Sequence, residues 1–321
     1  MGTYVIRRLV HALPVTVVIA FLCFSIVRLA PGDPVALLVD VSLTPPAEVD
    51  RLREDLGLTG PLPVQFARMV AQLATGRLHS LRTGQPVLTV LHERLPVTAV
   101  LLGAGIVLGT LLGVALGVLA AHRRNTWVDH GLSIGVLGGI SMPSFWLGLL
   151  LMYTFAGALH VLPPSGVRPV TRLDPTLLDM IPYFVMPTAV LALIVAPTMM
   201  RHTRSAMVET LAQEYIQAAR GKGLSELRVV VRHALRNALL PVVTLLGLLV
   251  PILMGSTAVI ESVFAMPGIG RLLVESAASR DYPVILTLNF LAAAFVLLSG
   301  VSVDACYAAL DPRLRLDRAG R

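Results

Sequence analysis

Charged residues are scarce in this sequence. Asp, Glu, Lys and Arg together make up 14% of its 321 residues, whereas 55% of the residues are hydrophobic. Soluble domains carry about a quarter charged residues, so this composition excludes an ordinary soluble domain and predicts an integral membrane protein. The formal net charge of +7 does not indicate nucleic-acid binding, because the basic residues lie between apolar runs and do not form one dense patch.

Cysteine and lysine are nearly absent. The two cysteines, Cys23 and Cys306, lie at opposite ends of the chain, so neither a disulfide framework nor a zinc site is predicted. The single lysine, Lys222, is followed by Gly223 and not by Ser or Thr, which excludes an ATP-binding P-loop. The eight histidines are scattered, and no HExxH motif is present. We therefore expect no catalytic residues, no metal site and no cofactor in this chain, and we do not expect an enzyme.

Long apolar runs are abundant instead. A membrane-spanning helix needs about 20 mostly apolar residues to cross about 30 Å of hydrocarbon. The runs are too long for the strands of a barrel, so they predict helices. The first run is also too long for the apolar part of a signal peptide, and we interpret it as an uncleaved span. The six predicted spans are 9–30, 96–121, 130–158, 181–200, 238–260 and 284–305.

The distribution of Arg and Lys predicts the orientation of these spans. The segments 159–180 and 261–283 hold only two basic residues each, which is typical of short external loops. Both termini are therefore expected in the cytoplasm. Within the long external loop, 45–58 and 65–73 are predicted to form helices. The predicted organisation is a cytoplasmic N-terminus and first span (1–30), the external loop (31–95), a five-helix core with a cytoplasmic segment at 201–237 (96–306), and a cytoplasmic tail (307–321).

The interiors of the predicted spans carry little charge and many glycines. No span has a charged residue near its middle, which argues against a proton-coupled secondary carrier, because such a carrier usually needs a buried titrating group. Glycines at four-residue spacing let helix backbones approach closely, so tight helix packing is expected at two places. These glycines are Gly109, Gly113 and Gly117 in the second span, and Gly131, Gly135 and Gly139 in the third.

The segment between the fourth and fifth predicted spans is polar and basic. Met207, Leu211, Tyr215 and Ala218 or Ala219 share one helical face, so a single helix is predicted through them. Gly221 and Gly223 are expected to end that helix, and Ser225 is predicted to cap a second one that runs to about Asn237.

This helix–turn–helix has two interpretations. The first is an amphipathic hairpin that lies on lipid headgroups. The second is a docking element for a soluble partner, in which small residues expose a short knob. The knob residues would be Ala218, Ala219, Gly221 and Gly223.

The run Gln217-Ala-Ala-Arg-Gly-Lys-Gly223 resembles the EAA-x3-G signature of the permease subunits of type I ABC importers. Gln217 stands where the general signature has Glu, and Arg236 stands where it has Pro. Both departures fit the peptide-importer branch, and the run from Glu214 to Leu224 is similar to the form usual there. Gly76-Arg-Leu78 departs from the Gly-Asp-Leu of the family. Further blocks that resemble the family are 30–34, 52–65, 94–98, 141–146, 259–270, 280–283 and 311–313.

The resemblance covers nearly the whole chain and implies the first permease subunit of a dipeptide or oligopeptide importer in a bacterial plasma membrane. It implies an all-α integral membrane fold with six spans. The implied partners are a second permease subunit, two cytoplasmic ATPase subunits that bind ATP and Mg²⁺, an external substrate-binding protein and membrane lipid, with no nucleic acid. The implied ATPase-coupling residues are Glu214, Tyr215, Gln217, Ala218, Ala219, Arg220, Gly221, Lys222, Gly223 and Leu224.

The resemblance does not assign substrate-binding residues, and two alternatives stay open. A permease of the same family could import nickel, haem or another small solute. From another class, a secondary transporter or a channel would also have several spans.

Overall fold

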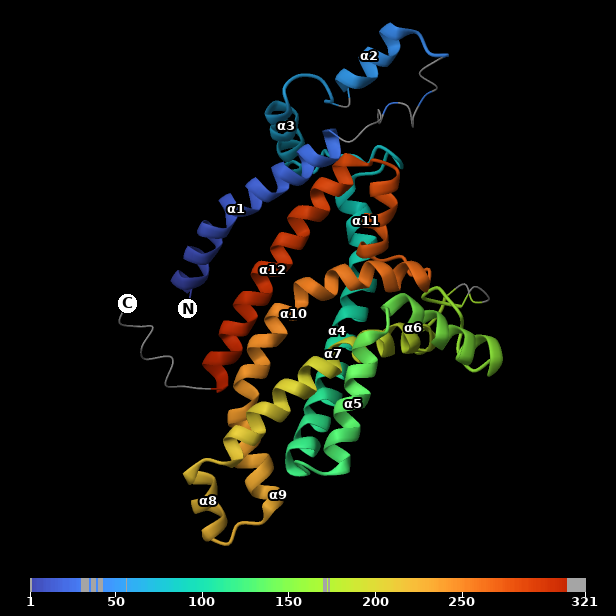
Figure 1. Ribbon diagram of the computed structural model, residues 1–321. Coiled ribbons are helices and arrows are strands. Elements are labelled where there is room, and N and C mark those ends of the chain that lie inside the picture. The colour runs from blue at the N-terminus through green and yellow to red at the C-terminus, as the bar shows by residue number, and fades with distance from the viewer. Residues whose placement is uncertain are drawn as a thin grey trace. The chain divides into compact units, whose positions relative to one another are not determined.

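Every regular element among the described residues is helical, and one isolated bridge joins His79 and Pro86. The computed structural model describes residues 2–29, 35, 39, 43–55, 57–169, 172 and 174–310. The predicted all-α class is confirmed, whereas the family blocks at 30–34 and 311–313 lie outside the described residues. The helices, shown in Figure 1, are α1 (Gly2–Leu29), α2 (Pro46–Asp55), α3 (Leu62–Ala74), α4 (Val87–His122), α5 (Trp127–Ser141), α6 (Ser144–Leu151), η2 (Met152–Ala158), α7 (Leu177–Leu211), α8 (Glu214–Gly221), α9 (Glu226–Arg228), η3 (Val229–Ala234), α10 (Leu235–Val263), α11 (Ile269–Ala278) and α12 (Tyr282–Leu310).

Several of these helices are apolar enough to cross a membrane. Among the described residues, two shorter apolar helices, Pro14–Leu29 and Ser144–Ala158, correspond to parts of the first and third predicted spans. The predicted count of six spans is therefore not confirmed. The helices that have both the length and the composition of a span are Val87–His122, Leu177–Leu211, Pro241–Val263 and Tyr282–Gly300.

The predicted span 130–158 is wrong as one continuous helix. α5 ends at Ser141, and Met142 has an extended backbone with φ −89° and ψ 128°. Pro143 then precedes the first residue of α6. A proline disfavours helical backbone in the residue before it, which accounts for the break at Met142. Figure 1 shows α5 and α6 running in different directions.

The chain divides into two compact units, and the first comprises Met1–Thr98 and Pro267–Leu297. α2 and α3 lie in this unit and confirm the two helices predicted within the external loop. Buried side chains from α1, α3, the start of α4, α11 and α12 form one apolar core. This core includes Phe24, Phe66, Val90, Leu272 and Tyr282.

Arg28 connects the end of α1 to the loop that follows it. Its Nε donates a hydrogen bond to Gln65 Oε1 at 3.2 Å, and its Nη2 donates one to the carbonyl of Leu58 at 3.2 Å. The guanidinium carbon lies 5.8 Å from the centre of the Tyr282 ring. This arginine therefore holds α3 and the start of α12 against α1.

The second unit comprises Ala99–Met266 and Leu298–Arg321, and within it α4 packs closely on α7. A Cβ atom added to Gly113 would lie 2.5 Å from Met199 Cβ and 2.6 Å from the carbonyl oxygen of Ala196. Gly109 and Gly117 meet α7 equally closely. Only glycine allows this approach, so the tight packing predicted for the first set of glycines is confirmed.

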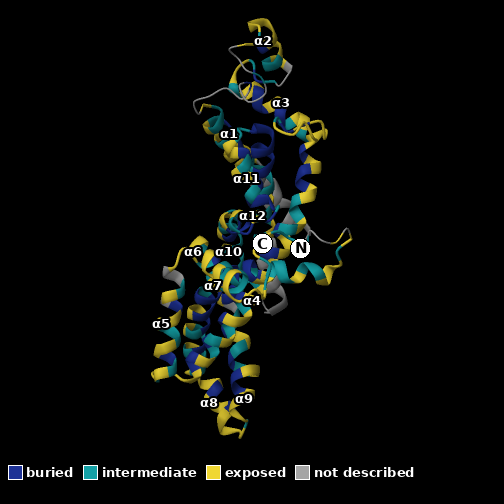
Figure 2. Cartoon of the chain, turned by 90° about the vertical axis from the view of Figure 1, so that its right-hand side faces the viewer, coloured by how far each residue is buried: buried dark blue, intermediate teal, exposed yellow. Residues whose placement is uncertain are grey.

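The second set of glycines behaves differently. A Cβ atom added to Gly131, Gly135 or Gly139 on α5 would have no described neighbour within 4 Å. The tight packing predicted at these glycines is therefore wrong within the described part of this chain. Figure 2 shows many exposed residues along α5.

Candidate functional site

The ten residues implied to couple to an ATPase lie on α8 and on the turn after it. α7 ends at Leu211, Gln213 has an extended backbone, and α8 begins at Glu214. The single helix predicted through Met207 and Ala219 is therefore wrong. The break after Leu211 turns α8 back, so that both α7 and α8 contribute to one apolar cluster.

Gly223 shapes the turn that follows α8. The N–H of Lys222 donates to the carbonyl of Ala218 at 3.1 Å, and the N–H of Gly223 donates to that of Arg220 at 2.9 Å. The φ of Gly223 is +77°, a left-handed conformation that favours glycine after a helix end. The predicted break at this glycine is confirmed.

The second predicted helix is longer than expected. Ser225 has an extended backbone and precedes α9, as predicted, but its side chain makes no capping hydrogen bond. The helix does not end near Asn237: α9, η3 and α10 follow one another without a gap as far as Val263. No glycine or proline lies between Ser225 and Pro241 to end it.

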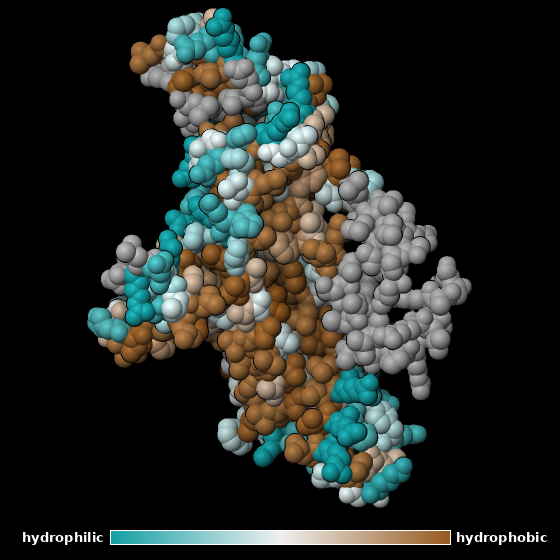
Figure 3. All heavy atoms as spheres, turned by 180° about the vertical axis from the view of Figure 1, so that it is seen from behind, coloured by the Kyte–Doolittle hydropathy of each residue, from teal (hydrophilic) through white to brown (hydrophobic). Residues whose placement is uncertain are grey.

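The two faces of α8 differ in burial. Ile216 is fully buried and Ala219 is 8% exposed, so the interpretation of Ala219 as part of an exposed knob is wrong. They pack in a cluster with Ala121, Met207, Val229, Val230, Ala234 and Ala238. The opposite face is exposed, and Figures 2 and 3 show the tip formed by α8 and α9 as exposed and largely polar. The exposed candidates are Glu214, Tyr215, Gln217, Ala218, Arg220, Gly221, Lys222 and Gly223, with Leu224 half-buried.

Two polar contacts fix α8 to the helix that follows. Asn237 Nδ2 on α10 donates a hydrogen bond to the Tyr215 hydroxyl at 2.7 Å. Arg220 donates two hydrogen bonds to Glu226, from Nη2 at 2.7 Å and from Nε at 3.1 Å, across the glycine turn. These hydrogen bonds raise the pKa of Arg220 and lower the pKa of Glu226. Both groups therefore stay charged over the physiological pH range.

A second charged contact supports α7 before it reaches α8. Arg204 on α7 donates two hydrogen bonds to Asp129 at the start of α5, and the Asp129 side chain is only 3% exposed. The Asn125 N–H also donates to Asp129 at 3.0 Å. The hydrogen bonds from Arg204, followed by that from Asn125, lower the pKa of Asp129 to about 2.

Two arrangements that would indicate chemistry can be checked in the described part of the chain. Among the residues that the structure describes, no group of three or more His, Cys, Asp or Glu side chains is placed to hold a metal ion. The run from Gly131 to Gly135 has the letters G-x-S-x-G, but it lies inside α5. A nucleophile elbow requires a turn between a strand and a helix, so this run is not one.

Sequence reasoning missed Ile216 and misjudged Ala219, which was expected to be exposed. The two are three residues apart, so helical spacing places them on one face once α8 is known to be a separate helix. The partners Asn237, Asp129 and Arg204 carry no comparable signal, because their contacts join helices that are distant in sequence.

The chain is similar over nearly its whole length to known transport proteins. Residues 113–316 match the family described as binding-protein-dependent transport system inner membrane component, and residues 1–102 match its N-terminal family. The chain is 36% identical over 316 residues to the oligopeptide transport system permease protein AppB of Bacillus subtilis, covering 98% of this chain and 99% of that protein. It is 39% identical over 321 residues to a Brucella suis protein described as a peptide permease, covering 98% of this chain and all of that protein.

A solved structure also resembles the chain. The inward-facing MetNI methionine ABC transporter includes a chain that aligns with a TM-score of 0.56 and 19% identity, covering 70% of this chain and 98% of that one. At this level of identity the likeness shows the fold alone, and it agrees with the expected all-α fold.

Proposed function

The chain belongs to the family of binding-protein-dependent transport system inner membrane components, and we propose that it is a transmembrane pathway subunit of an ATP-driven importer of di- or oligopeptides. The peptide class is inferred from relatives that cover the chain from end to end and are described as peptide or oligopeptide permeases. No observation in the described residues favours nickel, haem, a channel or a secondary carrier over this function.

The observation that carries the proposed coupling is the two-sided character of α8. One face is fixed to the rest of its unit through Ile216 and Ala219, whereas the opposite face is exposed and carries Gln217 and Ala218. We infer that the exposed face binds a separate ATPase subunit. Because α8 contacts α7 and η3, and is hydrogen-bonded to Asn237 of α10, a displacement of α8 would be transmitted to two long apolar helices together. Alternating access by rigid-body movement of the pathway follows from such a coupling.

The remaining parts of the importer are other chains. We infer a second permease subunit, two cytoplasmic ATPase subunits that bind ATP and Mg²⁺, and an external substrate-binding protein. In this arrangement α8 and both chain termini are cytoplasmic, the loop 31–95 is external, and the protein lies in a bacterial plasma membrane. The excess of Arg and Lys in the segments assigned to the cytoplasm supports this orientation.

The coupling is tested by a large substitution on the exposed face of α8. The complete importer is reconstituted in liposomes, and uptake of labelled peptide and ATP hydrolysis are measured with loaded binding protein outside. Ala218→Trp is expected to abolish both peptide uptake and the response of hydrolysis to binding protein, because the indole would prevent the ATPase from fitting against α8. Gly223→Trp is expected to act in the same direction by distorting the turn.

The control is Ala67→Trp, a change of the same size at an exposed position of α3, which should leave both rates unchanged. Import at the normal rate by a stably assembled Ala218→Trp complex would contradict the coupling role. Uptake of nickel or haem in place of peptide by the unmodified complex would overturn the substrate class.

A further inference from the structure

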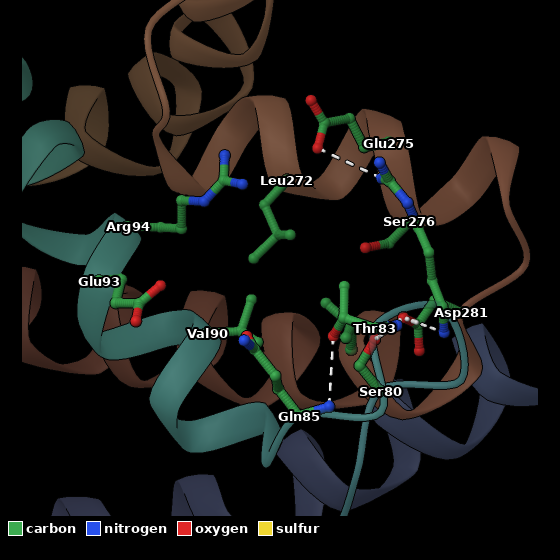
Figure 4. A pocket seen from close by; sticks show the side chains of 12 residues that line it. Ser80, Thr83, Gln85, Val90, Glu93, Arg94, Leu272, Glu275, Ser276 and Asp281 are labelled. Atoms are coloured by element: carbon green, nitrogen blue, oxygen red, sulfur yellow. Dashed lines mark hydrogen bonds and ion pairs between the residues drawn. The ribbon is translucent and has the colours of Figure 1, made fainter.

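A small polar pocket lies in the first unit, far along the chain from α8. It has a volume of about 90 Å³ and is formed by the loop before α4, the first turns of α4, α11 and the start of α12. Figure 4 shows Glu93 and Arg94 extending from α4 on one side, with Glu275 and Ser276 of α11 on the other. Its lining residues are Ser80, Arg82, Thr83, Gln85, Val90, Glu93, Arg94, Leu272, Glu275, Ser276, Asp281 and Val284.

The acidic groups on one side of this pocket already have partners. Asp281 accepts hydrogen bonds from the Ser80 hydroxyl, the Leu81 N–H at 3.1 Å and the Arg82 N–H at 3.4 Å. Glu275 accepts one from Arg271 Nε at 2.8 Å and one from Arg82 Nη1 at 3.5 Å. Glu275 is therefore paired with two arginines, and the oxygens of Asp281 are already engaged by donors of this chain.

Two hydrogen-bond donors in the pocket have no partner within the described part of the chain. Ser276 is only 3% exposed, and its hydroxyl, turned into the pocket in Figure 4, makes no hydrogen bond to another described residue. The half-buried guanidinium of Arg94 likewise makes no ion pair with any described carboxylate. Both donors line the pocket, so they are available to an acceptor that is supplied from outside the chain.

We propose that this pocket binds the carboxylate of a single Asp or Glu side chain presented by the external substrate-binding protein; the proposal rests on the importer function above. Arg is the side chain best suited to a carboxylate, because its planar fork donates two parallel hydrogen bonds. Val90, Leu272 and Val284 supply an apolar wall for the methylene groups of the incoming side chain.

The size and the position of the pocket favour a side chain over a whole peptide. Pockets that enclose a complete small-molecule ligand have about 300–1,000 Å³, whereas this one has about 90 Å³. All but one of the lining residues lie in the loop 31–95 or in the segment 261–283, both of which are external in the orientation proposed above. A protein that docks on the outer face would meet the pocket there.

Glu93 allows the charge of the incoming group to be tested. It also lines the pocket, it is exposed, and it has no partner within the described residues. Its carboxylate repels an incoming carboxylate and would attract an incoming cation. Neutralising Glu93 and neutralising Arg94 must therefore change the affinity for the binding protein in opposite directions.

The experiment measures ATP hydrolysis by the complete importer in liposomes against the concentration of peptide-loaded binding protein. Arg94→Gln should raise the concentration that gives half-maximal stimulation by about tenfold, with the maximal rate unchanged. Ser276→Ala should raise it less, and Glu93→Gln should lower it. The matched control is Arg68→Gln, which removes the same charge from an exposed position of α3 outside the pocket and should have no effect.

Each other outcome overturns the assignment. Equal half-maximal concentrations for Arg94→Gln, Glu93→Gln and the wild type would show that no charged group enters the pocket. An increase with Glu93→Gln and a decrease with Arg94→Gln would identify a cation as the occupant. Peptide uptake can also be measured with binding protein at a saturating concentration. If Arg94→Gln changes only the KM for peptide under that condition, the pocket binds the carboxylate of the peptide itself. A wild-type complex with no response to binding protein would overturn the proposed function and this assignment together.

Discussion

Arg204 holds Asp129 through two hydrogen bonds of 2.6 Å each, one from Nε to Oδ1 and one from Nη2 to Oδ2. The pair joins the first turn of α5 to α7, the helix that precedes the candidate coupling helix α8. Because Asp129 is almost fully buried, this pair is screened less by water than the other ion pairs among the described residues.

Asp129→Asn is expected to lower the free energy of unfolding by on the order of 1–2 kcal/mol at pH 7, allowing for the partial exposure of Arg204. The pKa of Asp129 is lowered from 3.8 to about 2, so the stabilisation is fully present above about pH 4 and is lost as the pH falls through about 2. Thermal unfolding in detergent should therefore separate wild type from Asp129→Asn at pH 7, and the difference should shrink below pH 4.

The control for this prediction is Asp50→Asn, which removes an exposed ion pair to Arg53. Exposed pairs contribute about 0–1 kcal/mol, so this change should have little effect at any pH. A difference between wild type and Asp129→Asn that stays constant from pH 7 to pH 2 would show that the charge of Asp129 is not the source of the stabilisation.

Gly113→Ala should destabilise the protein, whereas Gly135→Ala should not. The new Cβ at Gly113 would stand 2.5 Å from Met199 Cβ, and the carbonyl of Ala196 at 2.6 Å cannot move aside cheaply. Overpacking of this kind costs about 1–3 kcal/mol. At Gly135 a Cβ meets no described atom within 4 Å, so the better helix propensity of Ala should keep or raise the stability. Denaturation of the purified subunit in mixed micelles would check both, and equal stability of the two variants would contradict the close approach of α4 and α7.

The contrast between Gly113 and Gly135 shows what this sequence could and could not predict. Four-residue glycine spacing predicts that a helix can be approached closely, but the pattern does not say which neighbour, if any, lies there. The same limit applies around α8. The glycine break at Gly223 was predictable from residue type, whereas the break after Leu211 was not, because apolar spacing continues across it. The burial of Ala219 follows from that unpredicted turn.

The long-range contacts were beyond prediction for a related reason. Arg204 and Asp129 are 75 positions apart, and nothing in a single sequence selects one carboxylate among many for one arginine. The helical class and the presence of two helices in the external loop could be predicted, because they depend on local apolar spacing and on proline and glycine positions. Their ends were predicted less well: α2 ends three residues earlier and α3 begins three residues earlier than expected.

Ile216→Ala should destabilise the docking of α8 strongly. Ile216 is fully buried in the apolar cluster with Met207 and Val229, and removal of a buried isoleucine side chain to Ala costs about 2–5 kcal/mol. Gln217→Ala, on the exposed face, should leave the stability unchanged. Limited proteolysis within 211–225 would report the docking directly: faster cleavage is expected for Ile216→Ala only, and equal cleavage rates in both variants would contradict the packing.

Gly223→Ala should weaken coupling, whereas Gly221→Ala should not. Both positions have free space around a new Cβ, so sterics with neighbours do not distinguish them. They differ in backbone conformation, because Gly223 has φ +77° whereas Gly221 is the last residue of α8. A residue with a Cβ atom in the left-handed region costs about 1–2 kcal/mol. We expect the turn to relieve this strain by changing its conformation, which would rotate the exposed face of α8.

The measurement for these glycines is the ratio of peptide imported to ATP hydrolysed in the reconstituted importer. The ratio should fall for Gly223→Ala and stay normal for Gly221→Ala. Gly223→Asn should restore most of it, because Asn tolerates the left-handed conformation better than Ala does. If Gly223→Asn imports no better than Gly223→Ala, the left-handed backbone at Gly223 is not what the coupling turn requires.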